Sequence, residues 1–150
     1  LMPSINALGF AAKVSDERLG VASATKMCRS VMIKGLEAMV IESFTAARHY
    51  GVEDAVIASL GETFPGIDWE KQGAYFFSRV VQHGKRRAEE MLEAANTVKE
   101  AGLAPTMTAP IAEKHDWIAS LAREGVFDGV GKDAPWQDYA DRLLKLKPAS

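Results

Sequence analysis

The chain has 150 residues, of which 47% are hydrophobic and 25% are charged, and its formal net charge is −2. These values are typical of one soluble globular domain whose core is large enough to be stable without disulfides or a structural metal. The slight negative charge argues against a nucleic acid as the main partner. No apolar run is long enough to span a membrane. Because Cys28 is the single cysteine and no signal-peptide pattern is present, we expect a cytoplasmic protein.

The first residues have the pattern of a mixed α/β segment. Residues 3–8 predict a short helix, residues 10–15 alternate like a short strand, and residues 16–18 form a polar turn. Helix, strand and turn in so few residues are typical of the last unit of an α/β domain. We therefore expect the body of that domain to be missing from the chain, which would make the chain a segment of a longer polypeptide.

The longest helical pattern runs from Val21 to Gly51. No proline interrupts it, and apolar residues recur along it at the three-to-four spacing of a packed helix. Gly51 stands where a left-handed C-terminal cap is favoured. At about 1.5 Å per residue, such a helix is roughly 45 Å long. We expect the other helices to pack around it.

The rest of the chain predicts further helices with no fixed repeat. The expected ranges are 52–63, 68–82, 85–101, 108–123 and 135–145, separated by glycines and prolines. Asp68 is the expected N-cap of the third range, and Gly84 is expected to mark a bend or a close helix approach. The aromatic core is expected mainly from residues 69–81. The sequence thus predicts an all-α domain of five or six helices.

Lys26 is the first candidate for chemistry, because it lies in the first two turns of the long helix. Ser30 follows four residues later, so the two side chains share one helix face. A partly desolvated lysine beside a hydroxyl can exchange a proton with a substrate oxygen. The alternative is an ordinary surface lysine near a helix start, which the residues alone favour.

A basic cluster at residues 83–87 (HGKRR) is the second candidate. Three consecutive cations at an expected helix N-terminus oppose the helix dipole, which suggests a ligand anion or ion pairs with Glu89 and Glu90. We expect Cys28 to be a packing residue, since no histidine partner is evident. The three histidines have no metal spacing. No glycine-rich nucleotide motif, such as GxGxxG or GxxxxGK[ST], occurs in the chain.

Several blocks of the sequence resemble a known family. The run LGVASATKMCRSVMIKGLEAMVIESFTAARHYG is similar to the start of the helical C-terminal domain of the β-hydroxyacid dehydrogenases. This superfamily includes the 3-hydroxyisobutyrate and 6-phosphogluconate dehydrogenases. With HGKRRAEEM and AGLAPTMTAPIAE, the chain resembles a 6-phosphogluconate-dehydrogenase-like subgroup that has a domain of unknown function at this place. The resemblance covers about residues 1–125.

The resemblance implies roles for residues at the start of the long helix. The family pattern is Gly-x-Gly-x-x-x-Lys with asparagines three and four positions on. Gly20 matches the first glycine, Ala22 replaces the second, and Lys26 falls on the catalytic lysine. Arg29 and Ser30 replace the asparagines, so the general acid–base carries over and the substrate-holding amide does not.

The same resemblance supplies the remaining site residues. Ser23, Arg29 and Ser30 are the expected substrate-binding residues, and Arg29 would favour an anionic substrate. Lys85 falls on a family lysine near the nicotinamide, with Arg86 in place of the family aspartate, so both are expected to contact the cofactor.

The resemblance also implies the domain organisation and the partners. Residues 1–18 would end an N-terminal Rossmann-type domain that binds NAD or NADP, and residues 19–150 would form the helical substrate and dimerisation domain. The reaction would be hydride transfer between the cofactor and a small hydroxy acid, in a homodimer. The chain alone is expected to be inactive.

Two other classes remain open on the sequence. A non-enzymatic helical dimerisation or interaction module is compatible with all of the periodicity. In the enzyme, Lys26 should line a cleft and have a lowered pKa, whereas in the module it should be solvated. A nucleic-acid-binding domain is disfavoured by the charge and by the lack of a basic stripe.

Overall fold

The computed structural model describes residues 20–146, and all regular structure among them is helical. This confirms the predicted all-α class. The expected helix at residues 3–8 and strand at residues 10–15 lie outside the described residues. The helices are α2 (Val21–Tyr50), α3 (Glu53–Thr63), α4 (Trp69–Glu100), α5 (Thr108–Arg123) and α6 (Trp136–Leu144).

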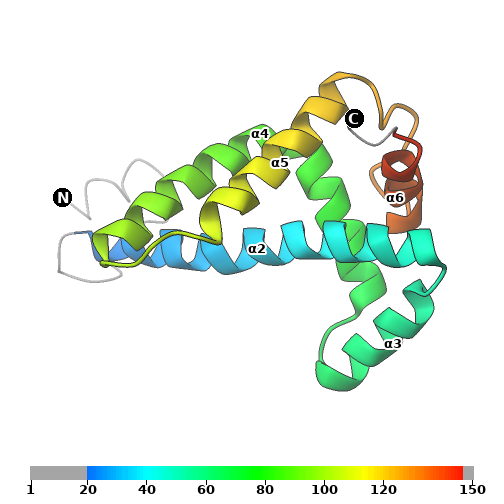
Figure 1. Ribbon diagram of the computed structural model, residues 1–150, viewed down its shortest axis with the longest axis horizontal. Helices are drawn as coiled ribbons and strands as arrows, with labels where there is room; N and C mark the ends of the chain where they lie inside the picture. The colour runs from blue at the N-terminus through cyan, green and yellow to red at the C-terminus, as the bar shows by residue number, and fades with distance from the viewer. Residues whose placement is uncertain (1–19, 147–150) are drawn as a thin grey trace, which may run out of the picture.

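Helix α2 is the axis of the domain, as its length predicts. It has 30 residues and ends at Gly51, whose φ of 66° is the expected left-handed cap. Arg48 and His49 lie in its last turn, where positive charge favours the helix dipole. Figure 1 shows α2 running along the domain, with α5 on one side of it, α4 crossing it, and α6 near its C-terminal end.

Helix α4 is a single helix of 32 residues, so the prediction of two helices separated at Gly84 was wrong. Asp68 caps it as expected and accepts a hydrogen bond from the backbone N–H of Lys71 at 3.0 Å. The helix bends in its middle (Figure 1) but does not end there. The expected close helix approach at Gly84 is confirmed, because this buried residue lies against α5.

The contact at Gly84 leaves no room for a side chain. A Cβ built there would lie 2.7 Å from the backbone oxygen of His115 and 3.1 Å from Cβ of Ala119. An alanine would therefore have to separate the backbones of α4 and α5. Glycine costs helix stability relative to alanine, but here it permits the two helices to pack closely.

We expect Gly84→Ala to lower the free energy of unfolding by about 1–3 kcal/mol, the usual cost of overpacking. Gly61→Ala in α3 is the matched control, since no atom lies within 4 Å of its built Cβ. That change should stabilise the protein by up to about 1 kcal/mol through helix propensity alone. Chemical denaturation of both variants measures the difference, and equal effects would contradict the close approach.

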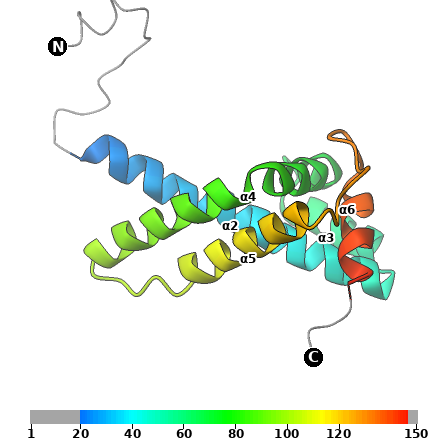
Figure 2. The same cartoon turned by 90° about the horizontal axis from the view of Figure 1, so that it is seen from above.

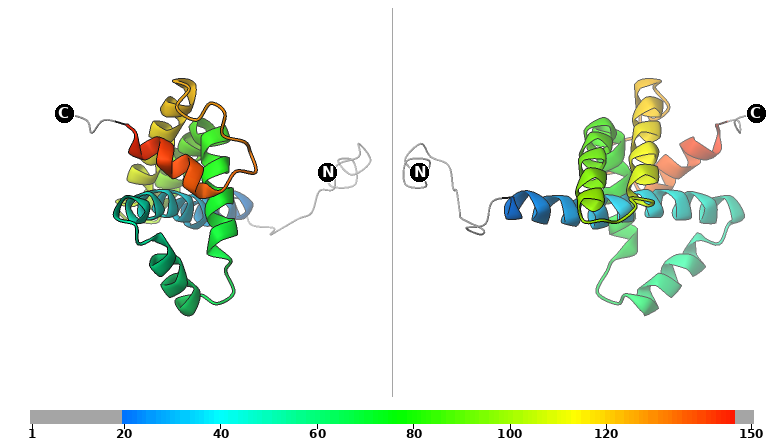
Figure 3. Two further views of the ribbon diagram at one scale, coloured as in Figure 1. Left: turned by 90° about the vertical axis from the view of Figure 1, so that its right-hand side faces the viewer. Right: turned by 60° about the vertical axis from the view of Figure 1, so that its left-hand side comes forward.

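The helices are arranged in two groups around α2. Helices α4 and α5 stand side by side against α2, and Figure 3 shows this pair from two directions. Helix α6 packs across the C-terminal half of α2 and against α4. Helix α3 has no buried residue and projects away from the α4–α5 pair.

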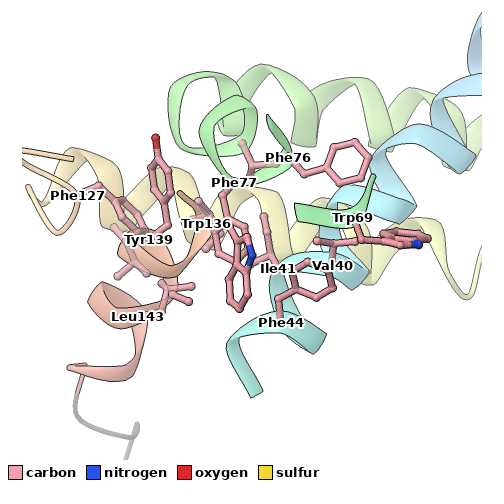
Figure 4. Close-up of a cluster of buried hydrophobic side chains, with 14 residues drawn as sticks. Val40, Ile41, Phe44, Trp69, Phe76, Phe77, Phe127, Trp136, Tyr139 and Leu143 are labelled. Carbon is pink, nitrogen blue, oxygen red and sulfur yellow. The ribbon is translucent and has the colours of Figure 1, made fainter. Parts of the chain in front are cut away.

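The main apolar core lies where α2, α4, α5 and α6 meet (Figure 4). Trp136 is completely buried, with its ring centroid 4.9 Å from Phe44 and 6.2 Å from Phe77. Its indole N–H donates to Oε2 of Glu70 at 2.7 Å, so the buried polar atom is satisfied. The aromatic residues expected from α4 are in this core, except Tyr75, which is exposed.

A second, smaller apolar cluster lies near the other end of α2. Its buried residues come from α2, α4 and α5: Met27, Ala38, Met91, Ala94, Ile111 and Ala112. Residues on these three helices that lie between the two clusters in sequence include several buried or half-buried charges. We call these residues the polar layer: Lys34, Glu37, Arg87, Glu90 and His115. The polar layer, rather than either apolar core, adjoins the predicted site.

Candidate active site

The predicted site residues of α2 divide into an exposed and a buried group. Ser23, Lys26 and Arg29 are exposed, whereas Ser30 is buried. Figure 2 shows the first turns of α2 diverging from the C-terminal end of α4. The side chain of Lys26 therefore lies where helices of the described chain do not cover it.

Polar residues continue along the same face of α2. Ser23, Lys26, Ser30, Lys34 and Glu37 recur at intervals of three and four, which places them in one line on a helix. Ser30, Lys34 and Glu37 are all less than 10% exposed. The line thus begins at the exposed end of α2 and continues into the interior.

A chain of contacts joins two predicted site residues that are 56 positions apart. The ammonium of Lys34 donates to Oγ of Ser30 at 3.2 Å and lies 2.7 Å from Oε2 of Glu90. The other oxygen of Glu90 accepts from Nε of Arg86 at 3.1 Å. Ser30, a predicted substrate residue, is therefore linked to Arg86, a predicted cofactor residue, through Lys34 and Glu90.

Beside this series of contacts lies a buried ion pair between α2 and α4. Arg87 donates Nε–H to Oε2 of Glu37 at 2.8 Å, and its Nη2 donates to the other oxygen. Nε2 of His115, from α5, lies 3.3 Å from the same carboxylate. Glu37 and His115 are both completely buried. Side chains of α4 and α5 thus contact one carboxylate of α2, and these contacts fix how the three helices pack against each other.

These contacts shift the pKa values of both carboxylates downward. Burial by itself raises the pKa of Glu37, but Arg87 and His115 together outweigh burial and hold this pKa below its usual value. The Lys34 ammonium likewise lowers the pKa of Glu90, against a smaller opposing effect of burial. Glu37 also raises the pKa of the Arg87 guanidinium. All three groups are therefore charged near neutral pH.

The lowered carboxylate pKa values predict a loss of stability in acid. When the folded-state pKa lies below the unfolded value, the unfolded state binds protons first as the pH falls. The stabilisation from Glu37 is therefore complete above its ordinary value of 4.5 and is lost as the pH falls through the lower folded value. We expect Glu37→Gln to flatten this part of the profile. Urea unfolding between pH 7 and pH 3 measures it, and parallel profiles would contradict the assignment.

The basic cluster at residues 83–87 does not lie at a helix N-terminus, so that expectation was wrong. The continuous α4 places it in mid-helix, and its members face different neighbours. Arg87 is paired with Glu37, and Arg86 with Glu90. Lys85 and Arg86 both line a groove of about 520 Å³ between α4 and α5, as does Arg123, but of the two cations Arg86 is the one paired with Glu90 in the described chain. The structure therefore joins Arg86, and not Lys85, to the predicted substrate residues.

Sequence reasoning named Glu90 as an ion-pair partner of the basic cluster, which the Arg86–Glu90 pair confirms, but it did not predict which charges are buried. Lys34, Glu37, Arg87, Glu90 and His115 are distributed over three helices, and no short motif contains them. A signal was present in α2, where Lys34 and Glu37 fall on the face that also carries the core residues. The prediction that Cys28 is a packing residue was wrong. Cys28 is exposed, because it lies on the side of α2 opposite to the buried face.

The described residues contain neither a metal-binding cluster nor a membrane-spanning helix. No group of three or more His, Cys, Asp or Glu side chains within residues 20–146 could hold a metal ion. None of the helices described for this chain combines the length and apolar character needed to cross a membrane.

Comparison with known proteins identifies the domain. Residues 47–118 match a family described as a domain of unknown function (DUF1932). A solved structure of a conserved hypothetical protein from Sinorhizobium meliloti 1021 is 38% identical, with a TM-score of 0.77, over 93% of this chain and 46% of that protein. Another solved structure, of a conserved protein of unknown function described as structurally similar to 3-hydroxyacid dehydrogenases, is 31% identical with a TM-score of 0.66. That alignment covers 82% of this chain and 46% of the other.

A curated relative is described as an uncharacterized protein in the 7S RNA 5′ region. This 28.5 kDa protein of Methanothermus fervidus is 33% identical over 102 residues, which cover 66% of this chain and 39% of that protein. The chain therefore spans less than half the length of each of these relatives. Together with the all-helical fold, the matches show that this chain is similar to the helical C-terminal domain found in 3-hydroxyacid dehydrogenase-like proteins.

Proposed function

We propose that this chain is the substrate-binding domain of an NAD(P)-dependent dehydrogenase that acts on a small, anionic hydroxy acid. Lys26 is the general acid–base, and Ser23, Arg29 and Ser30 bind the substrate. The observation that carries the proposal is the polar line on α2, whose inner part is fixed by buried contacts. Lys26 at its outer end is exposed in the described chain, so the cleft expected around it needs the Rossmann-type domain as its second wall. The similarity to 3-hydroxyacid dehydrogenases supports the same reaction class.

The chemistry at Lys26 is a proton transfer. In the oxidative direction, the neutral amine takes the proton of the substrate hydroxyl; in the reductive direction, the ammonium returns it to the carbonyl oxygen. Arg29 lies three positions on and is exposed, so it can attract the negative charge of a carboxylate. Ser30 adds a hydroxyl one turn from Lys26.

The residues at this end of the domain fit a cofactor that another domain mainly holds. In the described chain only Nε of the Arg86 guanidinium is engaged, by Glu90, and the side chain is 82% exposed. Its remaining N–H groups are therefore suited to a cofactor oxygen. Bound NAD or NADP would accept or supply the hydride. Residues 1–18 are proposed to end the Rossmann-type domain that binds it.

A homodimer is part of the same proposal. Large apolar side chains are exposed on α2 and just before α5, including Met32 at 65%, Met39 at 53% and Met107 at 62%. Met39 and Met107 line a groove of about 560 Å³ between α2 and α5. The alternative function, a dimerisation module without catalysis, draws on the same apolar surface and assigns the buried polar residues of α2 to helix packing alone.

The direct test is an assay of the full-length protein. The purified protein is mixed with NAD⁺ or NADP⁺ and a panel of small 3-hydroxy acids, and formation of the reduced cofactor is followed by absorbance. We expect turnover with at least one anionic hydroxy acid and none with the diol in which an alcohol replaces the carboxylate. Dimerisation without any turnover across the panel would favour the non-enzymatic module.

A further inference from the structure

The hydroxyl of Ser30 is buried, but its proton has no acceptor in the described chain. Ser30 is 6% exposed, and Lys34 donates to its Oγ at 3.2 Å. An ammonium has only donors, so in this contact the Ser30 oxygen must be the acceptor. The hydroxyl proton is therefore directed elsewhere.

The usual acceptor for such a proton is the backbone oxygen of the preceding helix turn. Thr25, Thr63 and Thr97 all donate to the carbonyl four residues earlier, at 2.8, 3.1 and 3.4 Å. Within residues 20–146, Ser30 makes no such bond. A buried donor left without a partner is costly, which indicates that the partner comes from outside these residues.

Lys34 is itself held in position. Its side chain is 7% exposed, and its ammonium lies 2.7 Å from Oε2 of Glu90, whose other oxygen is contacted by Arg86. The cations of Lys34 and Arg86 and the carboxylate of Glu90 together leave one net positive charge near Ser30. The surroundings of the hydroxyl proton therefore favour an acceptor that carries negative charge.

We propose that Lys34 is a positioning residue, which keeps the Ser30 hydroxyl oriented to donate a hydrogen bond to a carboxylate oxygen of the substrate. The inference rests on the proposed function and adds which substrate group Ser30 recognises and what orients it. Lys26 and Ser30 are one helix turn apart, so Lys26 serves the reacting hydroxyl at one end of the molecule and Ser30 its carboxylate at the other.

Binding of a simple carboxylate tests the inference without knowledge of the substrate. Sodium acetate is added to the isotope-labelled full-length protein, with sodium chloride at equal ionic strength as the reference, and backbone amide signals are followed by NMR. We expect acetate-specific shifts around residues 26–34. Ser30→Ala should abolish them, Lys34→Met should weaken them, and Lys34→Arg should restore them. Lys71→Met, an exposed lysine at the start of α4, is the matched control.

Kinetics with the best hydroxy acid of the panel provide the second arm. Ser30→Ala and Lys34→Met should raise KM about 10–100-fold, the effect of losing one hydrogen bond to a charged group, with kcat changed only a few-fold. Ser30→Ala keeps the test decisive if Lys34→Met does not fold, because it removes a single oxygen atom.

The outcomes separate this inference from the proposed function. Normal KM values for both variants, or no acetate-specific shift in the unmodified protein, would overturn the inference while leaving Lys26 catalysis intact. Undiminished turnover of a Lys26→Ala variant would instead overturn the proposed function. A fall in kcat with unchanged KM would also count against a positioning role for Lys34.

Discussion

Replacing Lys26 with alanine is expected to lower kcat of the full-length protein about 10²–10⁴-fold, the usual contribution of a general acid–base. The side chain is exposed on α2, away from the buried ion pairs, so its removal should leave the fold intact. Steady-state kinetics with the best hydroxy acid of the panel measure the loss.

Two further variants show whether the proton or only the charge matters. Lys26→Arg keeps a positive charge but cannot release its proton in the working range, so it should be nearly as inactive as alanine. Lys71→Ala removes an exposed lysine from α4 and should retain full turnover. Activity of Lys26→Ala close to that of the unmodified protein would leave the helical interaction module as the better explanation of the fold.

Replacing Glu37 with alanine is expected to destabilise the protein by about 3–5 kcal/mol, the cost of removing one partner of a buried ion pair. The carboxylate is completely buried and accepts both hydrogen bonds of the Arg87 guanidinium, so its loss leaves a cation in the interior without a partner. Within the described residues, it also removes the contact of α2 with His115 of α5 in this layer. Chemical denaturation monitored by circular dichroism measures the loss.

The double variant Glu37→Leu/Arg87→Met separates the role of the pair from that of its packing. Because apolar residues of similar volume can replace a buried ion pair at little cost, the double variant should recover most of the stability lost in Glu37→Ala. Asp141→Asn, which breaks a partly exposed pair with Arg48, should have a much smaller effect. A loss in Glu37→Ala no larger than that in Asp141→Asn would show that the buried layer does not hold the helices together.

Local signals predicted most of the helices. The long α2, its Gly51 cap and the Asp68 cap of α4 all follow from spacing and from single residues whose backbone preferences are strong. The error at Gly84 has a tertiary cause. Glycine normally weakens a helix, and only the contact with α5 explains why the helix continues through it.

The candidate site was predicted less completely. Lys26 and its neighbours came from the resemblance of a contiguous stretch, and their roles remain a proposal. The link from Ser30 through Lys34 and Glu90 to Arg86 joins α2 to α4 across more than fifty positions, and no local pattern contains it. Lys85 and Arg86 are adjacent in sequence and line the same groove, but Arg86 is the one that pairs with Glu90, because the i,i+4 spacing places these two residues on one helix face.

The sequence by itself determined the helical class, the long axis and the position of Lys26 at its exposed end, because these depend on periodicity and caps within one segment. Only the tertiary structure decided which charges are buried. Whether Lys34 and Glu37 meet water or partners depends on where α4 and α5 cross α2, and a buried charge is tolerated only where those helices supply its counter-charge. The polar layer that leads to Ser30 is therefore a property of three packed helices rather than of any one of them.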